Sequence, residues 1–157
     1  MIRIAKILLL IGAGIVVILA LFIARPCPSC EKEIDVSDIS AVEIRNTTFQ
    51  VDVADTDAER IKGLSGKESL SERTGMLFIF EESAPRSFWM KDMRFSIDIV
   101  WIDKNRKIVG IHRHVSPETY PQSFVSPEPV MYVLEVAEGV SSFMNIGDTV
   151  NFIKSSQ

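Results

Sequence analysis

Two carboxylates stand inside otherwise apolar, strand-like runs, and they are the sharpest candidates for chemistry. Asp98 lies in the run I-D-I-V-W-I and Glu135 in the run Y-V-L-E-V-A. A buried carboxylate without a partner is costly or takes up a proton, so each needs an explanation. Either the two carboxylates pair with cations or accept hydrogen bonds, and so tie a loop or helix to a sheet, or they form a general acid/base pair or a polar cleft floor. The available cations are Arg60, Arg73, Lys91 and Arg94.

The segment F-W-M-K-D, residues 88–92, combines an aromatic face with a charged turn. Strand alternation turns Trp89 away from both of its neighbours, so one side of this strand must be core. Trp89 is therefore either packed in the core or, with Lys91, part of a platform for sugars or cations. We expect a cleft bordered by this turn, a proline-rich loop and Arg60. The predicted binding residues are Arg60, Trp89, Lys91, Asp92, Asp98 and Glu135.

Two histidines and a glutamate have a spacing similar to the metal motif of cupins. His112, His114 and Glu118 form H-x-H-x-x-x-E, and both imidazoles fall on one face of a strand. The cupin pattern requires glycines where Arg106 and Val125 stand. We therefore favour solvent-facing histidines at a strand end and expect no metal, with a cupin-like site as the weakest alternative. No phosphate-binding loop or nucleophile motif is present in the sequence, so we expect no cofactor.

The composition is that of a folded globular chain with an acidic balance. Of the 157 residues, 46% are hydrophobic and 24% are charged, and the net charge is -4. Arg3 and Lys6 are the cations of the first 24 residues, so the rest of the chain is more acidic still. Such a domain is a poor electrostatic partner for nucleic acid, and we expect no nucleic-acid binding.

Residues 1–25 are predicted to form an N-terminal membrane anchor. Residues 7–24 carry no charge, and as a helix these 18 residues span about 27 Å, close to the thickness of a bilayer core. Arg3 and Lys6 precede this segment, whereas Arg25 and Lys32 after it are accompanied by four acidic residues of the segment 31–38. The charge difference predicts a single-pass membrane protein with a cytoplasmic N-terminus and an extracytoplasmic C-terminal domain. A cleaved signal peptide and a lipoprotein are the alternatives, but residues 22–26 fit neither processing site well.

Residues 26–40 are predicted to be a linker, because prolines, serines and mixed charges dominate the segment. Cys27 and Cys30 lie there in a C-x-x-C spacing. Neither a βαβ context nor a second cysteine pair accompanies them, so a passive local disulfide or two thiols are favoured over a redox or metal motif.

Residues 41–157 are predicted to be an all-β domain with one short peripheral helix. Thr56 and Glu59 form a capping box, so a helix begins near residue 57, with an apolar stripe through Ile61 and an end at Gly63 or Gly66. Four prolines in residues 115–129 indicate a long loop. Many short strands with turn residues between them favour a compact β-barrel or a jelly-roll-like sandwich. The expected strands are a hairpin over 42–53 and the segments 75–80, 88–90, 97–102, 107–114, 130–137 and 149–153.

Six short motifs occur along the chain in the same order as in the family called domain of unknown function 192, which the sequence resembles from about residue 49 to residue 152. The resemblance implies a compact β-barrel or sandwich in proteins that are often secreted or membrane-anchored, with no established activity. The family usually has Met at position 65, Arg at 67 and Asn-Thr at 92–93, where this chain has Ser65, Lys67, Asp92 and Met93. The motifs are R-I-K-G-L-S (60–65), G-M-L-F-I-F (75–80), F-W-M-K-D (88–92), I-D-I-V-W-I-D (97–103), Y-V-L-E-V-A-E-G (132–139) and I-G-D (146–148).

The function expected from these observations is that of a membrane-anchored extracytoplasmic module that binds a ligand or a protein. The prediction depends on an anchor joined to a small β domain without a catalytic signature. The alternative is a hydrolase that acts on envelope material through Asp98 or Glu135.

Overall fold

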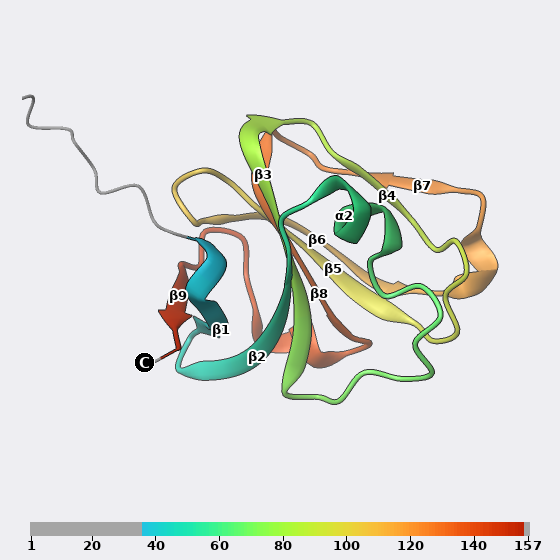
Figure 1. Cartoon of the computed structure of the whole chain (residues 1–157), viewed down its shortest axis with the longest axis horizontal. Coiled ribbons are helices and arrows are strands. Elements are labelled where there is room, and N and C mark those ends of the chain that lie inside the picture. The colour runs from blue at the N-terminus through green and yellow to red at the C-terminus, as the bar shows by residue number, and fades with distance from the viewer. Residues whose placement is uncertain (1–35, 156–157) are drawn as a thin grey trace, which may run out of the picture. The chain divides into compact units, whose positions relative to one another are not determined.

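A computed structural model describes residues 36–155 of the chain (Figure 1). The predicted membrane segment, Cys27 and Cys30 lie outside the described residues. The first described element is the 3₁₀ helix η1 (Val36–Asp38), and strand β1 begins at Ile39. Both fall inside the segment 26–40 that was expected to be linker.

The central feature is a seven-stranded mixed sheet with the strand order β6-β5-β8-β3-β2-β1-β9. Its neighbouring strands are antiparallel except for β2 and β3, which run parallel. A second sheet has two antiparallel strands, β4 (Ser87–Trp89) and β7 (Ser123–Val125). The strands of the large sheet are β1 (Ile39–Ile44), β2 (Thr47–Ala54), β3 (Thr74–Ala84), β5 (Ile97–Ile102), β6 (Ile108–Val115), β8 (Val130–Ala137) and β9 (Val150–Lys154).

The predicted barrel is wrong, because the large sheet of the described residues does not close. Its edge strands β6 and β9 meet only at one corner, where Lys107 and Thr149 form an isolated bridge. The strands β4 and β7 form a separate sheet and do not extend the large one. Short strands with turns between them are common to barrels and open sheets, so the sequence pattern alone did not distinguish these architectures.

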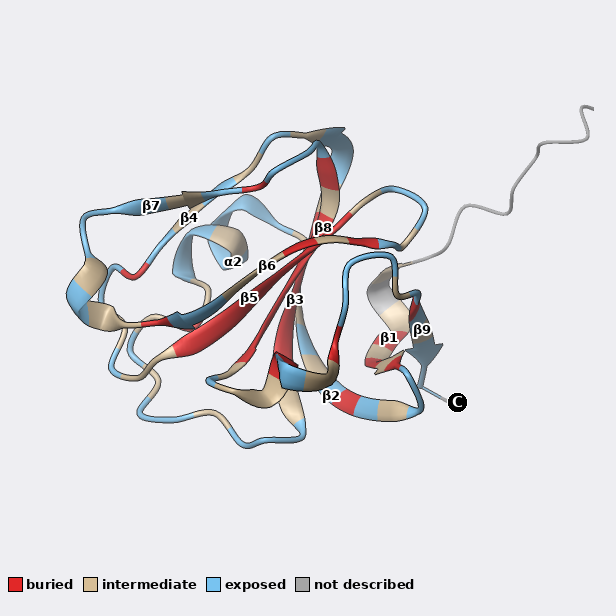
Figure 2. Ribbon diagram, turned by 180° about the vertical axis from the view of Figure 1, so that it is seen from behind, coloured by how far each residue is buried: buried red, intermediate tan, exposed pale blue. Residues whose placement is uncertain are grey.

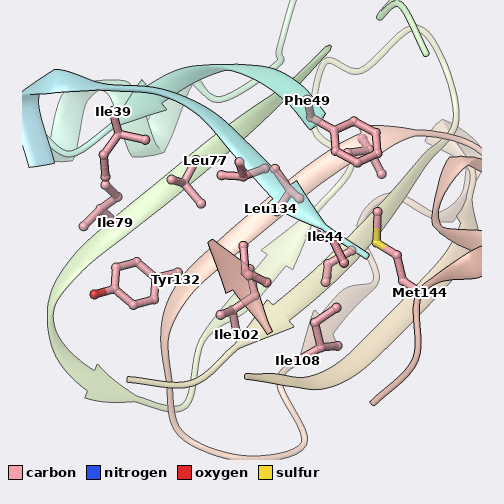
Figure 3. Close-up of a cluster of buried hydrophobic side chains, with 14 residues drawn as sticks. Ile39, Ile44, Phe49, Leu77, Ile79, Ile102, Ile108, Tyr132, Leu134 and Met144 are labelled. Atoms are coloured by element: carbon pink, nitrogen blue, oxygen red, sulfur yellow. The ribbon is translucent and has the colours of Figure 1, made fainter. Parts of the chain in front are cut away.

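Both faces of the large sheet are covered, and its central strands are buried (Figure 2). All six residues of β5 are buried, in agreement with a strand that is apolar at every position except Asp98. One face carries the cluster that includes Val100, Ile102 and Leu134, shown in Figure 3. The other face carries a cluster that includes Ile97, Ile99 and Trp101. The strand predicted over 97–102 is therefore confirmed, and each of its faces packs in a core.

The hairpin at the start of the domain is confirmed. β1 and β2 pair antiparallel, with Ile44 opposite Thr47. The two turn residues, Arg45 and Asn46, both have positive φ angles of 48° and 65°. That backbone twist matches the twist of the flanking strands and is favoured in two-residue hairpin loops.

The proline-rich segment contains more structure than a loop. It holds the 3₁₀ helix η2 (Pro117–Thr119) and the strand β7, which the sequence analysis missed. Its end lies against the large sheet, because a Cβ atom placed on Gly110 of β6 would meet Pro127 Cγ at 2.6 Å. Glycine at position 110 therefore allows the segment after β7 to cross β6 closely.

The single α-helix of the described residues, α2 (Asp57–Lys62), begins and ends where the sequence predicted. Thr56 and Glu59 form the capping box, and Gly63 follows the helix with a φ angle of 47°. The predicted apolar stripe is wrong, because no residue of α2 is buried and Ile61 is 83% exposed. A helix of six residues presents too little surface for such a stripe, and polar contacts attach it instead.

Candidate functional site

The two candidate carboxylates lie on opposite faces of the large sheet. Asp98 is paired across the strands with Val136, and Glu135 with Ile99. Paired residues of adjacent strands point to the same side of a sheet. Val136 belongs to one core cluster and Ile99 to the other, so the two carboxylates point into different cores. They do not form an acid/base pair.

Asp98 is bonded to backbone, and none of its partners within residues 36–155 is a cation. Its side chain is fully buried, and its oxygens accept hydrogen bonds from the backbone N–H groups of His114 at 2.9 Å and Ser141 at 3.0 Å. Ser141 belongs to the 3₁₀ helix η3 (Val140–Phe143). The carboxylate thus joins β6 and η3 across β5, in agreement with the structural interpretation, although the predicted cationic partner is wrong.

Glu135 is buried among apolar side chains. It is 5% exposed, and its cross-strand neighbours are Met76 and Ile99. Its carboxyl group makes no ion pair or hydrogen bond with another side chain or with backbone in residues 36–155, so the predicted cationic partner is absent there. Burial raises the pKa of Glu135 to about 8, so the carboxyl group is mostly protonated at neutral pH.

An open groove lies between α2 and β4, which we call the α2–β4 groove. It has a volume of about 390 Å³, within the range of small-molecule sites. Ile61 and Trp89, on its two sides, are 83% and 54% exposed. Aromatic rings form part of the floor of the groove, where Phe88 packs edge-to-face against Phe78 at 4.8 Å between the ring centres. The lining residues are Asp57, Arg60, Ile61, Lys62, Gly63, Leu64, Ser65, Phe78, Phe80, Ser87, Phe88, Trp89 and Met93.

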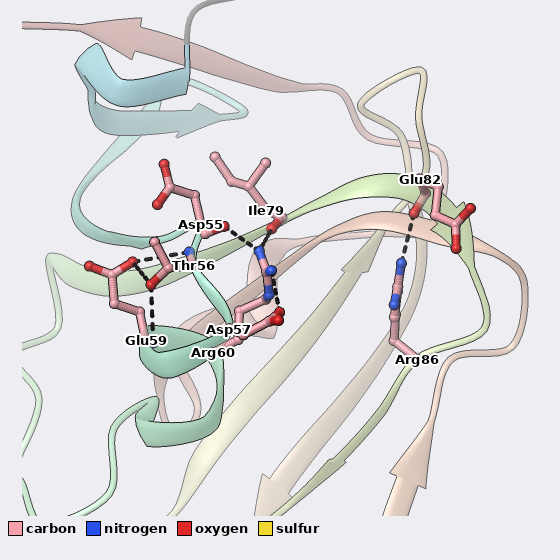
Figure 4. Close-up of polar contacts among 8 residues, drawn as sticks. All are labelled: Asp55, Thr56, Asp57, Glu59, Arg60, Ile79, Glu82 and Arg86. Atoms are coloured by element: carbon pink, nitrogen blue, oxygen red, sulfur yellow. Dashed lines mark hydrogen bonds and ion pairs between the residues drawn. The ribbon is translucent and has the colours of Figure 1, made fainter.

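Arg60 attaches α2 to the sheet. One guanidinium nitrogen donates to the carbonyl oxygens of Asp55 and Ile79, and another bonds the Asp57 carboxylate at 2.7 Å (Figure 4). The guanidinium also lies 5.4 Å from the centre of the Phe80 ring. Most of its hydrogen-bonding capacity is therefore used within the domain, and Arg60 shapes the groove more than it offers a charge to a ligand.

Trp89 points outward, as alternation along the strand requires. Its neighbour Met90 is 2% exposed, and Phe88 packs in the core cluster below. The indole contacts Tyr120 of the proline-rich segment at 6.0 Å between ring centres, and Lys91 Nζ lies 6.0 Å from the indole ring. The binding-platform interpretation of Trp89 and Lys91 is thus compatible with their exposure, whereas core packing of Trp89 is not.

Asp92 lies in the turn that follows β4. Its φ angle is 57°, and its carbonyl oxygen accepts a hydrogen bond from Gly66 N–H at 3.0 Å. Asp and Asn tolerate this backbone conformation better than other residues that have a side chain. The Asn that the family usually has at this position would meet the same backbone requirement, so the difference need not reflect a ligand.

The histidines and Glu118 do not form a metal site. His112 Nδ1 accepts a hydrogen bond from Trp101 Nε1 at 2.7 Å, and burial lowers the pKa of His112. His114 Nδ1 instead lies 2.9 Å from a Glu138 carboxylate oxygen. Among residues 36–155, no group of three or more potential ligands gathers that could hold a metal ion.

The sequence analysis placed Arg60 and Trp89 at a shared cleft, and both line the α2–β4 groove. Lys91 and Asp92 follow directly after β4, whereas Asp98 and Glu135 lie in the two cores. The analysis missed Ile61 and Phe80 as groove residues. Ile61 has helical spacing to Leu64, which suggested a buried stripe, and nothing in the local sequence marks its exposure.

The fold is that of a small, mixed β-sheet domain, and the α2–β4 groove is its candidate site. The chain belongs to the family DUF192, described as Uncharacterized ACR, whose sequence model matches residues 40–152. The predicted resemblance is thereby confirmed. No curated protein matches the chain.

Two solved structures share the fold. A protein of unknown function from Novosphingobium aromaticivorans is 26% identical, with a TM-score of 0.68 over 72% of this chain and 84% of that one. A proposed transcription regulator from Sinorhizobium meliloti is 28% identical, with a TM-score of 0.68 over 71% of this chain and 92% of that one. The second protein consists almost wholly of the matched domain, which supports folding of this domain by itself.

Proposed function

We propose that the protein is a non-catalytic binding module, held on the outer side of a membrane by residues 7–24, and that the α2–β4 groove is its site. The observation that carries the proposal is the pair of exposed side chains, Ile61 and Trp89, on either side of an apolar floor. Large apolar side chains so far exposed around a concave surface mark binding sites. The hydrolase alternative has less support, because Asp98 and Glu135 are buried on opposite faces of the sheet.

The groove is tested with the anionic fluorescent probe anilinonaphthalene sulfonate and the domain of residues 36–157. Burying a large apolar side chain contributes about 1.5–3 kcal/mol, so Ile61→Glu and Trp89→Ala should each raise the dissociation constant of the probe about tenfold or more. Fluorescence titration measures the change. The exposed Ile61 makes little contact with the core, so the urea midpoint of Ile61→Glu should stay close to that of the wild type.

The matched control is Ile146→Glu, because Ile146 is 71% exposed but lies in a turn outside the groove. This variant should bind the probe as the wild type does. Equal probe binding by the wild type and Ile61→Glu would refute the groove as the site.

The membrane placement is tested with reporter fusions after Gln157. Arg3 and Lys6 before the apolar segment favour a cytoplasmic N-terminus and hence an extracytoplasmic domain. The candidate segment lies outside the described residues, and no helix within residues 36–155 is long and apolar enough to cross a bilayer. We expect activity from a reporter that functions only outside the cytoplasm. Activity from a reporter that functions only inside it would reverse the proposed orientation.

A further inference from the structure

One wall of the α2–β4 groove is the edge of a strand. Ser87, Phe88 and Trp89 are consecutive, and all three line the groove. Side chains of consecutive strand residues point to opposite faces, so a groove that reaches all three must run along the side of the strand. The opposite side of β4 is paired with β7.

The backbone groups on this open side follow from the pairing with β7. Ser126 N–H donates to the Arg86 carbonyl oxygen at 2.9 Å, so the pair formed by Arg86 and Ser126 is hydrogen-bonded. Hydrogen-bonded positions alternate along an antiparallel pair, which directs the backbone of Phe88 toward β7 and that of Ser87 and Trp89 toward the groove. Within residues 36–155, the N–H and C=O groups of Ser87 and Trp89 take no backbone partner outside the strand ladders.

The segment that follows α2 contacts the turn after β4, just beyond the open stretch of the strand edge. Lys91 lies in the turn after β4, two residues beyond Trp89, and its carbonyl oxygen accepts a hydrogen bond from Ser65 Oγ at 2.9 Å. Residues 65 and 66 therefore close one end of the edge, and the stretch from Ser87 to Trp89 stays open to a partner from outside.

We propose that the α2–β4 groove takes an extended peptide segment of a partner protein, which adds to β4 as a third strand of the β4–β7 sheet. The inference rests on the proposed function and specifies its ligand class. Main-chain hydrogen bonds to an exposed strand edge give affinity in such complexes, and pockets for alternate side chains give specificity. At about 3.3 Å per residue, the three residues of β4 match a segment of three to five residues.

The side chains around the edge define the chemistry of that peptide. Positions beside Phe88 face the apolar floor, where Leu64 and Met93 also lie, so they require apolar side chains. Positions on the Trp89 side face outward near Lys91. Lys62 also lines the groove and forms no ion pair within the described residues. The surface therefore fits a peptide that alternates apolar and acidic residues.

The probe is a blocked five-residue peptide of alternating glutamate and valine, measured by calorimetry against the domain of residues 36–157. Two N-methylated forms are compared, one methylated at the valines and one at the glutamates. In an extended peptide the two sets of N–H groups point to opposite sides. One form should bind about tenfold or more weakly because it cannot donate to Ser87 and Trp89, and the other should bind nearly as the parent does.

The protein offers a matched pair of variants. Ser87→Pro removes the N–H that points into the groove, whereas Ser123→Pro removes one on the outer edge of β7, opposite Trp89 in register. Proline is tolerated in an edge strand where the N–H faces away from the ladder. We expect the loss of peptide binding in Ser87→Pro only. The amide protons of Ser87 and Trp89 should exchange more slowly with solvent in the complex.

The outcomes separate the two proposals. If the fluorescent probe binds in an Ile61-dependent manner but the peptide does not, or if both N-methylated forms bind equally, strand addition is refuted and the groove remains a binding site. Absence of binding by both the fluorescent probe and the peptide overturns the proposed function together with this inference.

Discussion

The Glu135→Gln domain is expected to gain stability relative to the wild type as the pH rises, from little difference near pH 4.5 to several kcal/mol above pH 8. Burial raises the pKa of Glu135 to about 8, from 4.5 for the model compound. The unfolded chain therefore loses this proton at a much lower pH than the folded domain does. Gln keeps the shape of the protonated side chain and cannot ionise, so it removes this source of instability.

The direction of the effect follows from the linkage between protonation and folding. A carboxyl group whose pKa is higher in the folded state favours folding most below its unfolded pKa, and this advantage is lost as the pH rises through the folded pKa. The window is thus pH 4.5 to about 8. At about 1.4 kcal/mol for each pH unit, the loss over the whole window has an upper bound of about 5 kcal/mol.

The measurement is urea unfolding of the two domains at a series of pH values, with the difference in free energy of unfolding plotted against pH. The difference between the two proteins is used because other groups also make stability depend on pH. Burial lowers the pKa of His112, so the domain becomes less stable as the pH falls, and this effect is the same in both proteins. Glu82→Gln serves as the control, since Glu82 is exposed and its replacement should change the free energy of unfolding by less than about 0.5 kcal/mol. A flat difference for Glu135→Gln would contradict a buried, protonated carboxyl group.

Local signals in the sequence predicted the elements well. The capping box of Thr56 and Glu59 correctly predicted the start of α2, and the apolar run of residues 97–102 correctly predicted the strand β5. The pairing of strands was harder. The parallel pairing of β2 with β3 depends on contacts between distant segments, and β7 is a three-residue strand among prolines that pairs with a distant partner. Neither pairing leaves a local pattern in the sequence. Nothing in the sequence therefore distinguished the open sheet from the predicted barrel.

The candidate site could be predicted only in part, because some of its positions follow local rules and others depend on strand register. Trp89 was placed on an outward face by strand alternation, which is a local rule. The faces on which Asp98 and Glu135 lie depend on register. Asp98 pairs with Val136, the residue after Glu135, and consecutive residues of one strand point to opposite faces. A sequence reveals that two carboxylates interrupt apolar strands. It does not reveal that one accepts backbone hydrogen bonds, whereas the other makes no such bond within the described residues.

Asp98 is expected to be the opposite case to Glu135, in that its removal destabilises the domain. The carboxylate is fully buried and accepts the N–H groups of His114 and Ser141. The Asp98→Ala variant leaves both donors without an acceptor, and each orphaned buried donor costs about 1–3 kcal/mol. The η3 segment is also held by Arg113, which donates to the Ser141 and Met144 carbonyl oxygens, so its attachment is weakened but not lost.

The total expected loss for Asp98→Ala is therefore about 3–5 kcal/mol, a large share of the stability of a small domain, which is commonly about 5–15 kcal/mol. Urea unfolding of the domain of residues 36–157 measures it. Asp52→Ala is the matched control, because the Asp52 side chain is 66% exposed and forms a surface ion pair with Lys67, whose loss should cost less than about 1 kcal/mol. Faster amide hydrogen exchange at His114 and Ser141 in Asp98→Ala would locate the effect. Equal urea midpoints for Asp98→Ala and Asp52→Ala would show that these two hydrogen bonds do not hold η3 to the sheet, and would make Asp98 available for another role.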